Sequence, residues 1–225
     1  MPIRYALKEM GEKAADLVLK DDIIGLGSGS AVESFVNALS TKFESKELTV
    51  VPSSLQITQI ADKFGLNIGS SKLLNKITIA FDGADQVDKN YNLIKGGGGA
   101  LFRERIILLT AKKRVILADE SKFAEFLDKQ IPVETHIFAR VSVSNSLKLL
   151  GGTPIIRANQ KGYPIFTENG NLIYDVDFGA VKTPIDLHLK IKEIPGVIDS
   201  GLFSIPLDKI FKAKTDGSVD IIEPR

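Results

Sequence analysis

The chain has 225 residues, of which 44% are hydrophobic and 25% charged, and its 29 basic and 28 acidic side chains leave a net charge of +1. This balance argues against a basic nucleic-acid-binding protein and against a long acidic tail. The absence of cysteine and the presence of only two histidines, His136 and His188, argue against thiol catalysis, disulfides, a histidine-built metal site and a Ser-His-Asp triad.

The first half of the chain alternates predicted helices and strands. In chain order we expect a helix at Tyr5–Lys20, a strand at Ile23–Leu26, a helix after the glycine-rich Gly25–Ser30, a strand at Leu48–Val51, a helix at Leu55–Phe64, a strand at Ile77–Phe81, a helix from Ala100 to about Thr110 and a strand at Val115–Ala118. This alternation is typical of an α/β protein with a doubly wound, mostly parallel, Rossmann-like sheet.

The second half has a different pattern. We expect a strand at Pro132–Phe138, a helix at Ala139–Leu150, antiparallel strands at Thr153–Asn159 and Tyr163–Asp177 with a turn at Asn169-Gly170, a helix from Pro184 to about Glu193 and a strand at Val197–Ile205. This order predicts a smaller, inserted α+β domain of the ferredoxin-like type. The predicted domains are therefore residues 1–128 plus 204–225, which form the Rossmann-like part, and residues 129–203.

The glycine-rich segment Gly25–Ser30, with the sequence GLGSGS, lies between the first predicted strand and the helix after it. Glycines let the backbone turn sharply, and the amides at a helix N-terminus attract anions, most often phosphate. The segment lacks the third glycine of a dinucleotide fingerprint, and Pro52-Ser53-Ser54 stands where a carboxylate would bind ribose hydroxyls. The pattern favours a phosphorylated small molecule over NAD, although a plain strand-to-helix turn fits the same residues.

Two aspartates, Asp82 and Asp85, follow the predicted strand at Ile77–Phe81 in the sequence DGAD. Ligands of open parallel sheets bind at the carboxyl ends of the strands, where paired carboxylates can bind sugar hydroxyls, share a proton or hold a lysine. Such turns also form for purely local reasons. Further on, Lys95 precedes four glycines, Gly96–Gly99, a costly run that is tolerated where the backbone must approach a ligand closely. A lysine beside the aspartates could stabilise an oxyanion.

Other charged residues are candidates, each with a simpler alternative. Glu104, near the start of the helix after the glycines, could face a cleft or pair with a neighbouring arginine. Lys122, in the sequence ADESK after another predicted strand, could reach a phosphate or remain a surface lysine. Lys8 belongs to a run of alternating charges that is most simply a solvated helix face. We interpret His136 and His188 as structural or surface groups.

Taken together, these motifs resemble those of type A ribose-5-phosphate isomerase. GLGSGS, DGAD, the block KGGGGALFRE (Lys95–Glu104) and ADESK occur in that family's order and spacing, and Thr167–Asp175 and Ile194–Phe203 are similar to its second half. The resemblance covers nearly the whole chain and thins after Phe203. It implies an aldose–ketose isomerase without metal or cofactor that interconverts ribose 5-phosphate and ribulose 5-phosphate through a cis-enediolate, as a homodimer or homotetramer.

The resemblance also implies roles for individual residues. Glu104 matches the family's proton acceptor, and Asp82, Asp85 and Lys95 match the polar cluster that handles ring opening and the substrate oxygens. Substrate contacts carry over to Ser28, Gly29, Ser30 and Ala31, to Gly83 and Ala84, to Gly96, Gly97 and Gly98, to Lys122, and to Lys8 near the family's N-terminal phosphate-binding lysine.

The sequence departs from the family pattern at a few positions. Threonine is common where Ala31 stands, glutamate usually follows DGAD where Gln86 stands, and Phe102 replaces a smaller or aliphatic residue. The tail Asp208–Arg225 lacks the family's strongly apolar closing strand. A backbone amide at Ala31 could still donate to a substrate, so the departure there affects a side-chain contact and not the site.

The chemistry of these residues agrees with such a reaction. A single carboxylate can move a proton between adjacent carbons, which typically contributes roughly 10²–10⁴-fold, while Lys95 supplies positive charge and the phosphate anchors the substrate. The alternatives are another sugar-phosphate enzyme on this fold, such as an amino-sugar-phosphate deaminase or a lactonase, and a non-catalytic sugar-phosphate sensor. No apolar run approaches the roughly 20 residues of a membrane helix and no secretory signal is visible, so we expect a cytoplasmic protein with no membrane or nucleic-acid partner.

Overall fold

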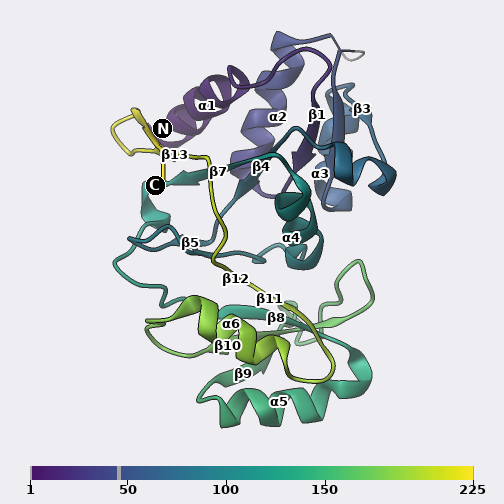
Figure 1. Cartoon of the computed structure of the whole chain (residues 1–225), viewed down its shortest axis with the longest axis vertical. Helices are drawn as coiled ribbons and strands as arrows, with labels where there is room; N and C mark the ends of the chain where they lie inside the picture. Colours follow the sequence, from purple (N-terminus) through teal and green to yellow (C-terminus); the bar gives the residue numbers. More distant parts are fainter. Residues whose placement is uncertain (1, 45–46, 225) are drawn as a thin grey trace. The chain divides into compact units, whose positions relative to one another are not determined.

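The computed structural model describes residues 2–44 and 47–224, and this part of the chain divides into two compact units (Figure 1). Unit 1 comprises the residues up to Ala84, Arg103–Lys122 and the chain from Ile205 onward, and unit 2 comprises Asp85–Phe102 and Phe123–Ser204. The predicted domains are residues 1–128 plus 204–225 and residues 129–203. The observed division differs chiefly in residues 85–102, which belong to unit 2 and not to the Rossmann-like part. These residues group with unit 2 because one of their strands pairs with Leu202–Phe203.

Unit 1 is built on a mostly parallel sheet. Its strands are β1 (Ile23–Leu26), β2 (Thr49–Pro52), β3 (Asn67–Ile68), β4 (Ile79–Gly83), β7 (Lys113–Asp119), β13 (Lys209–Ala213) and β14 (Val219–Ile222). They lie in the order β14-β13-β7-β4-β1-β2-β3, and every neighbouring pair is parallel except β13 with β14. The helices of this unit are α1 (Pro2–Ala15), α2 (Ser30–Lys42), α3 (Leu55–Lys63) and α4 (Leu101–Thr110), with short 3₁₀ turns η1 (Ser71–Lys76) and η2 (Glu120–Lys122). The predicted α/β fold with a mostly parallel sheet is confirmed.

Helices cover both faces of this sheet, as a doubly wound fold requires. Ile24 and Leu26 of β1 belong to a buried core shared with α1, α2 and α3, in which Phe35 stacks on Phe81 with ring centroids 3.9 Å apart. Gly25 points to the opposite face, because side chains alternate along a strand. A Cβ atom at Gly25 would lie only 2.4 Å from Cγ2 of Ile107 on α4. The absence of a side chain there lets α4 pack directly on β1.

The ends of unit 1 differ from the sequence-based expectation. The first helix ends at Ala15 and not at Lys20, and the chain continues through tight turns whose amides bond three residues back. Val18 is nonetheless buried, which explains why apolar periodicity continues past the helix. The tail, which lacks the strongly apolar closing strand of the family pattern, nonetheless forms β13 and β14. Within the part of the chain that the structure describes, no helix combines the length and apolar character needed to cross a bilayer.

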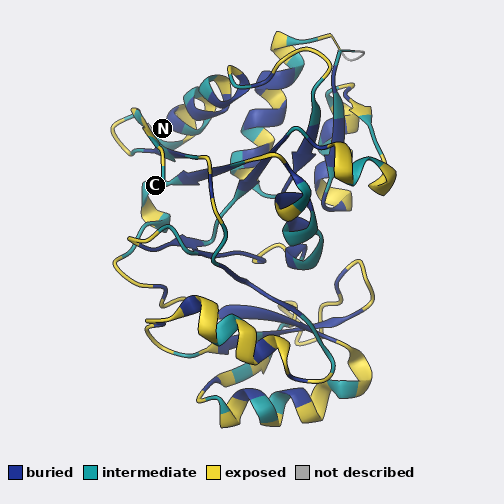
Figure 2. Ribbon diagram, in the orientation of Figure 1, coloured by how far each residue is buried: buried dark blue, intermediate teal, exposed yellow. Residues whose placement is uncertain are grey.

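Unit 2 contains the predicted ferredoxin-like arrangement. Its elements are β8 (Ile131–Thr135), the 3₁₀ turn η3 (Ile137–Ala139), α5 (Arg140–Leu149), β9 (Thr153–Ile156), β10 (Leu172–Asp177), α6 (Pro184–Lys192) and β11 (Val197–Ser200). The strand order β11-β8-β10-β9, antiparallel throughout, is that of a split β-α-β unit. The inner faces of α5 and α6 are buried against this sheet and their outer faces are exposed (Figure 2). A second sheet, in the order β12-β6-β5, joins β5 (Gln86–Val87), β6 (Leu93–Ile94) and β12 (Leu202–Phe203).

The strands of unit 2 are shorter than predicted. Between β9 and β10 the chain makes only isolated bridges, Ala158 to Pro164 and Phe166 to Leu172. The predicted turn at Asn169-Gly170 is confirmed, with Gly170 at φ +78° and its amide bonded to Thr167 O. The predicted strand Val197–Ile205 divides at Gly201 into β11 and β12, because the Gly201 amide bonds Pro132 O and its carbonyl accepts from Lys95.

Candidate functional site

The glycine-rich segment forms the predicted turn from β1 into α2. The Gly27 amide donates to Phe81 O over 2.8 Å, which ties the end of β1 to β4. A Cβ atom at Gly27 would lie 1.7 Å from Oδ1 of Asp82, so only glycine leaves space for that carboxylate. Gly29 adopts φ +99° as the N-cap of α2, a backbone conformation essentially restricted to glycine. Ser30 and Ala31 are the first residues of the helix, where backbone amides are available to an anion.

Asp82 lies at the carboxyl end of β4 and is 1% exposed. Its Oδ1 accepts a hydrogen bond of 2.7 Å from the Gly83 amide. Gly83 lies close to the glycine-rich turn, since a Cβ atom there would be 3.3 Å from Ser28 O. The end of β4 and the turn after β1 are therefore neighbours at one edge of the sheet, as the strand-end argument predicts.

Glu104 lies in the first turn of α4 and is 3% exposed. Its Oε1 accepts a hydrogen bond of 2.6 Å from Oγ of Ser28. A buried carboxylate is costly unless hydrogen bonds stabilise it, and here a hydroxyl 76 residues away in sequence serves that purpose. Within unit 1 the structure thus brings together three of the predicted residues, Ser28, Asp82 and Glu104, at the carboxyl ends of β1 and β4.

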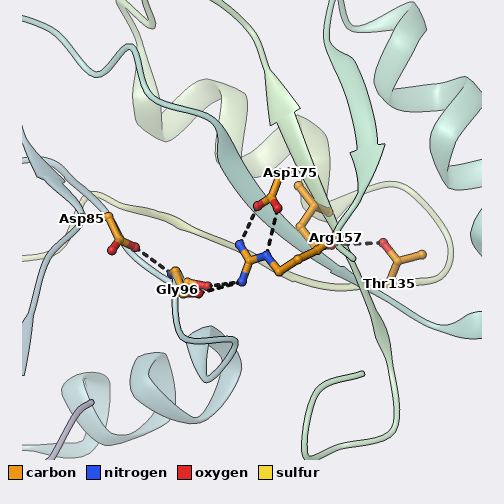
Figure 3. Close-up of polar contacts among 7 residues, drawn as sticks. Asp85, Gly96, Thr135, Arg157 and Asp175 are labelled. Atoms are coloured by element: carbon orange, nitrogen blue, oxygen red, sulfur yellow. Dashed lines mark hydrogen bonds and ion pairs between the residues drawn. The ribbon is translucent and has the colours of Figure 1, made fainter. Parts of the chain in front are cut away.

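Asp85 belongs to unit 2, where the glycine loop after Lys95 holds it. Its backbone amide donates to Ile94 O, and its Oδ2 accepts a hydrogen bond of 2.7 Å from the Gly97 amide (Figure 3). Gly97 is matched to this contact, because a Cβ atom there would lie 2.7 Å from Oδ1 of Asp85. The carbonyl oxygen of Asp85 also accepts from Nζ of Lys129.

Lys95 is 2% exposed at the end of β6. Its amide donates to Gly201 O over 2.9 Å, and its Nζ lies 5.6 Å from the ring centroid of the fully buried Phe203. A cation over an aromatic face is attracted by the ring's electrons. Because the side chain is largely removed from water, the charge of its ammonium acts more strongly on a neighbouring dipole than it would in bulk solvent.

The backbone conformation itself requires glycine in the four-glycine run, in addition to the predicted approach of a ligand. Gly96 and Gly99 have φ of +99° and +84°, in the region where other residues are strained. The Gly99 amide donates to Gly96 O, which closes a tight turn before α4. Gly97 and Gly98 are exposed, so their backbone is accessible to a ligand.

The remaining predicted residues lie apart from these contacts. Lys122 ends η2, directly after β7, and is half-buried. Lys8 is exposed on α1 and forms an ion pair with Glu12 at 3.6 Å, as the solvated-face interpretation predicts. His136 caps η3 through Nδ1, and His188 contacts Ser200 Oγ, in keeping with structural roles.

Sequence reasoning missed several contacts of this region. Gln86 stands where glutamate is usual, and its side-chain amide both donates and accepts. Its Nε2 donates to Asp128 Oδ1, which a carboxylate could not do, and its Oε1 accepts hydrogen bonds from the backbone amides of Asp128 and Lys129. Arg157 contacts two carbonyl oxygens of the glycine loop, and Asp175 contacts Arg157. The one available signal for this pair was Asp175, an acidic residue within the apolar run of β10.

The arrangement supplies groups for proton transfer and anion binding. Unit 1 offers the buried Glu104 carboxylate with its hydroxyl donor and the Asp82 carboxylate, and unit 2 offers the buried Lys95, the Asp85 carboxylate and exposed glycine amides. Over residues 2–44 and 47–224, no cluster of three or more His, Cys, Asp or Glu side chains is placed to hold a metal ion. A buried carboxylate such as that of Glu104 can remove and return a proton on a carbon beside a carbonyl.

Comparison with known proteins gives a consistent result. The sequence profile of the family "Ribose 5-phosphate isomerase A (phosphoriboisomerase A)" matches residues 49–217. A ribose-5-phosphate isomerase A of Methanosarcina acetivorans is 37% identical over 215 residues, which cover 94% of this chain and 92% of the relative. The solved ribose 5-phosphate isomerase A of Methanocaldococcus jannaschii has a TM-score of 0.90 at 33% identity and 98% coverage of both chains. A D-ribose-5-phosphate isomerase in complex with phospho-erythronic acid has a TM-score of 0.93 at 31% identity, covering 99% of this chain and 100% of that one.

Proposed function

This chain belongs to the ribose 5-phosphate isomerase A family, and from that premise we propose that it interconverts ribose 5-phosphate and ribulose 5-phosphate with Glu104 as the proton-transferring base. The observation that carries the proposal is the buried Glu104 carboxylate, oriented by the 2.6 Å hydrogen bond from Ser28 Oγ. A related isomerase is solved in complex with phospho-erythronic acid, a phosphorylated sugar acid, which supports the substrate class.

In the proposed reaction Glu104 removes the proton from C2 of the open-chain aldose. The C2–H electron pair forms the C1–C2 double bond, and the carbonyl pair moves onto O1, which gives a cis-enediolate. The same carboxyl group returns its proton to C1, while the O2 proton passes to O1 and the carbonyl forms at C2. One carboxylate suffices, because both carbons are neighbours on one face of the enediolate, and such catalysis typically contributes roughly 10²–10⁴-fold.

Lys95 stabilises the negative charge that develops on the enediolate oxygens. Its burial near Phe203 strengthens this effect, since electrostatic interactions grow where water is excluded. Asp82 and Asp85 bind the sugar hydroxyls and move their protons as the furanose ring opens. Backbone groups of Gly83, Ala84 and the loop at 96–98 contact the same oxygens.

The phosphate anchors the substrate away from the reacting carbons. Ser28, Gly29, Ser30 and Ala31 offer hydroxyls and the first amides of α2, to which anions bind readily. Lys122 adds a positive charge after β7, and Lys8 a second one from α1. Such remote contacts convert binding energy into correct placement of the reacting carbons.

Proton exchange measured by NMR tests this function. Purified protein and ribose 5-phosphate in deuterated water should give ribulose 5-phosphate with deuterium at the reacting carbon, with or without a chelator. Glu104→Gln should lower turnover by about 10²–10⁴-fold while sugar-phosphate binding persists, and Glu125→Gln, at an exposed ion pair with Lys89, serves as the matched control. Sugar-phosphate binding without any exchange by the wild type would indicate the sensor, and near-full turnover by Glu104→Gln would overturn the assignment of the base.

The family also leads us to propose a cytoplasmic homodimer or homotetramer. Large apolar side chains of unit 2 are exposed in the single chain, among them Phe138 at 92% and Leu149 at 88%, which favours assembly because such surface is unfavourable in water. Light scattering on the purified protein measures the oligomeric state, and a monomer at micromolar concentration would contradict the proposal. Fractionation of producing cells tests the location.

A further inference from the structure

Arg157, immediately after β9, contacts the loop that follows Lys95 (Figure 3). Its Nη1 lies 2.9 Å from Gly96 O and 3.0 Å from Gly97 O. The two ends of this contact are about 60 residues apart in sequence and belong to the same compact unit. A single nitrogen therefore holds two successive carbonyl oxygens of the glycine loop.

Asp175 of β10 fixes the guanidinium from the other side. Its Oδ2 accepts from Nε over 2.9 Å, and its Oδ1 accepts from Nη2. The side chains of Arg157 and Asp175 are only 14% and 22% exposed. Two parallel hydrogen bonds between planar groups define an orientation that a single ion pair would not. The arginine is thus a rigid support on the antiparallel sheet.

The contact with Gly96 has a specific geometric consequence. Gly96 C=O and Gly97 N–H belong to one peptide group, and Gly97 N–H donates to Oδ2 of Asp85. That peptide is therefore held at its oxygen by Arg157 and at its hydrogen by Asp85. A cation on the carbonyl also polarises the peptide, which strengthens the N–H as a donor. The chain of contacts runs from Asp175 through Arg157 and the peptide to Asp85.

The glycine loop needs such a support. Successive glycines lose more conformational freedom on ordering than any other residues, and Gly97 and Gly98 are exposed. Lys95 immediately precedes the peptide that Arg157 and Asp85 hold. Without the hydrogen bonds of Arg157 and Asp85, the Gly96–Gly97 peptide would sample several orientations.

We propose that Arg157 is a positioning residue of the isomerase, which fixes the Gly96–Gly97 peptide and thereby places both Lys95 and the Asp85 carboxylate. The inference rests on the proposed function, in which these two side chains act on the substrate. Arg157 itself touches no reacting atom. Its removal should therefore reduce turnover more than substrate binding, because Lys95 acts on charge that develops only in the transition state.

The test compares three variants with the wild type. Arg157→Lys keeps a charge but not the planar fork, and Arg157→Met removes both. Arg114→Gln is the matched control, since Nε of Arg114 likewise donates to a backbone carbonyl, Leu108 O at 2.7 Å, in unit 1. For each we would measure kcat, KM, thermal unfolding and the ¹H–¹⁵N shift of the Gly97 amide.

We expect kcat to fall about 10-fold in Arg157→Lys and about 10²-fold in Arg157→Met, as misplacement of roughly 1 Å does, with KM changed less than about 3-fold. The Gly97 amide shift should move in both variants, and Arg114→Gln should change neither kcat nor that shift. Wild-type kcat in folded Arg157→Met, or a loss of activity that only follows the loss of folded protein, would overturn the proposal. Absence of isomerisation by the wild type would instead refute the proposed function.

Discussion

The two aspartates of the DGAD tetrapeptide are fixed by different means. Asp82 lies within a parallel sheet, and its carboxylate occupies the space that Gly27 leaves by having no side chain. Asp85 lies beyond the sheet, stays half-buried and accepts a hydrogen bond from the amide of Gly97, 12 residues further on. The first is held by packing and the second by a loop that itself depends on Arg157.

The difference predicts how each position responds to change. A buried group in a close-packed sheet cannot move without disturbing its neighbours, so a substitution that displaces Asp82 should reduce stability. A group held by a loop hydrogen bond can rotate into a new position at little cost, so a substitution that displaces Asp85 should affect function first. Gly27 and Gly97 allow a direct test, because an added Cβ atom would meet an aspartate carboxylate at both positions.

Gly27→Ala should have the largest effect. The new Cβ atom would lie 1.7 Å from Oδ1 and 1.9 Å from Cγ of the buried Asp82, and overpacking of this kind costs up to about 3 kcal/mol or more of unfolding free energy. Urea unfolding measures the loss. Asp82→Ala removes the obstructing atoms, so the double variant should be less destabilised than the sum of the two single variants. Simple additivity would mean that another contact causes the effect.

Gly97→Ala should change activity and leave stability nearly intact. Its Cβ atom would lie 2.7 Å from Oδ1 of Asp85, which can rotate away, and surface changes usually stay within about 0.5 kcal/mol. Loss of the hydrogen bond to the Gly97 amide should lower kcat about 10-fold, the equivalent of roughly 1.4 kcal/mol in the barrier. The measurements are steady-state kinetics and urea unfolding. A stability loss as large as that of Gly27→Ala, with kcat unchanged, would reverse the comparison.

The same difference explains how much could be predicted from the sequence. The placement of Asp82 after β4 and of the glycine turn after β1 follows from local patterns, since strand ends of a parallel sheet share one edge. The Ser28–Glu104 contact could be predicted for the same reason. The sequence also indicated the parallel sheet of unit 1 and the β11-β8-β10-β9 sheet of unit 2, because alternation of strands and helices in the first half and the turn at Asn169-Gly170 in the second are local signals.

The contacts of unit 2 could not be predicted in this way. Nothing near Lys95 indicates that Arg157 would hold the next two carbonyls, because that contact depends on the register of β10 with β9 and β8. The short strands β5 and β6 escaped detection for a related reason, as two-residue strands have no periodicity. The tail formed β13 because Ile210 and Phe211 are buried beside β7, a tertiary effect that outweighs the modest apolar content of the segment.

The smallest effect is expected at Glu120, whose contact involves neither the packing of the sheet nor the glycine loop. It begins η2, the turn that ends at Lys122, and its Oε1 accepts from the hydroxyl and from the amide of Thr215 in the β13–β14 turn. The hydrogen bond from the Thr215 side chain, followed by that from its amide, holds the pKa of Glu120 below its ordinary value. The contact therefore stabilises the fold above the unfolded-state pKa, and this contribution is lost as pH falls through the lower folded-state pKa.

Glu120→Gln should accordingly lower the melting temperature slightly at pH 7, by less than either glycine substitution. The difference from the wild type should shrink toward zero below about pH 4, where the unfolded carboxyl is already protonated. Because the contact is exposed and its charge is screened by solvent, the sugar-phosphate binding that we propose, to which Lys122 would contribute, should change less than about 2-fold. Thermal unfolding of both proteins across this pH range measures the effect. A difference that grew with acidity would mean that the Thr215 contact favours the protonated carboxyl, contrary to the geometry of two donors on one oxygen.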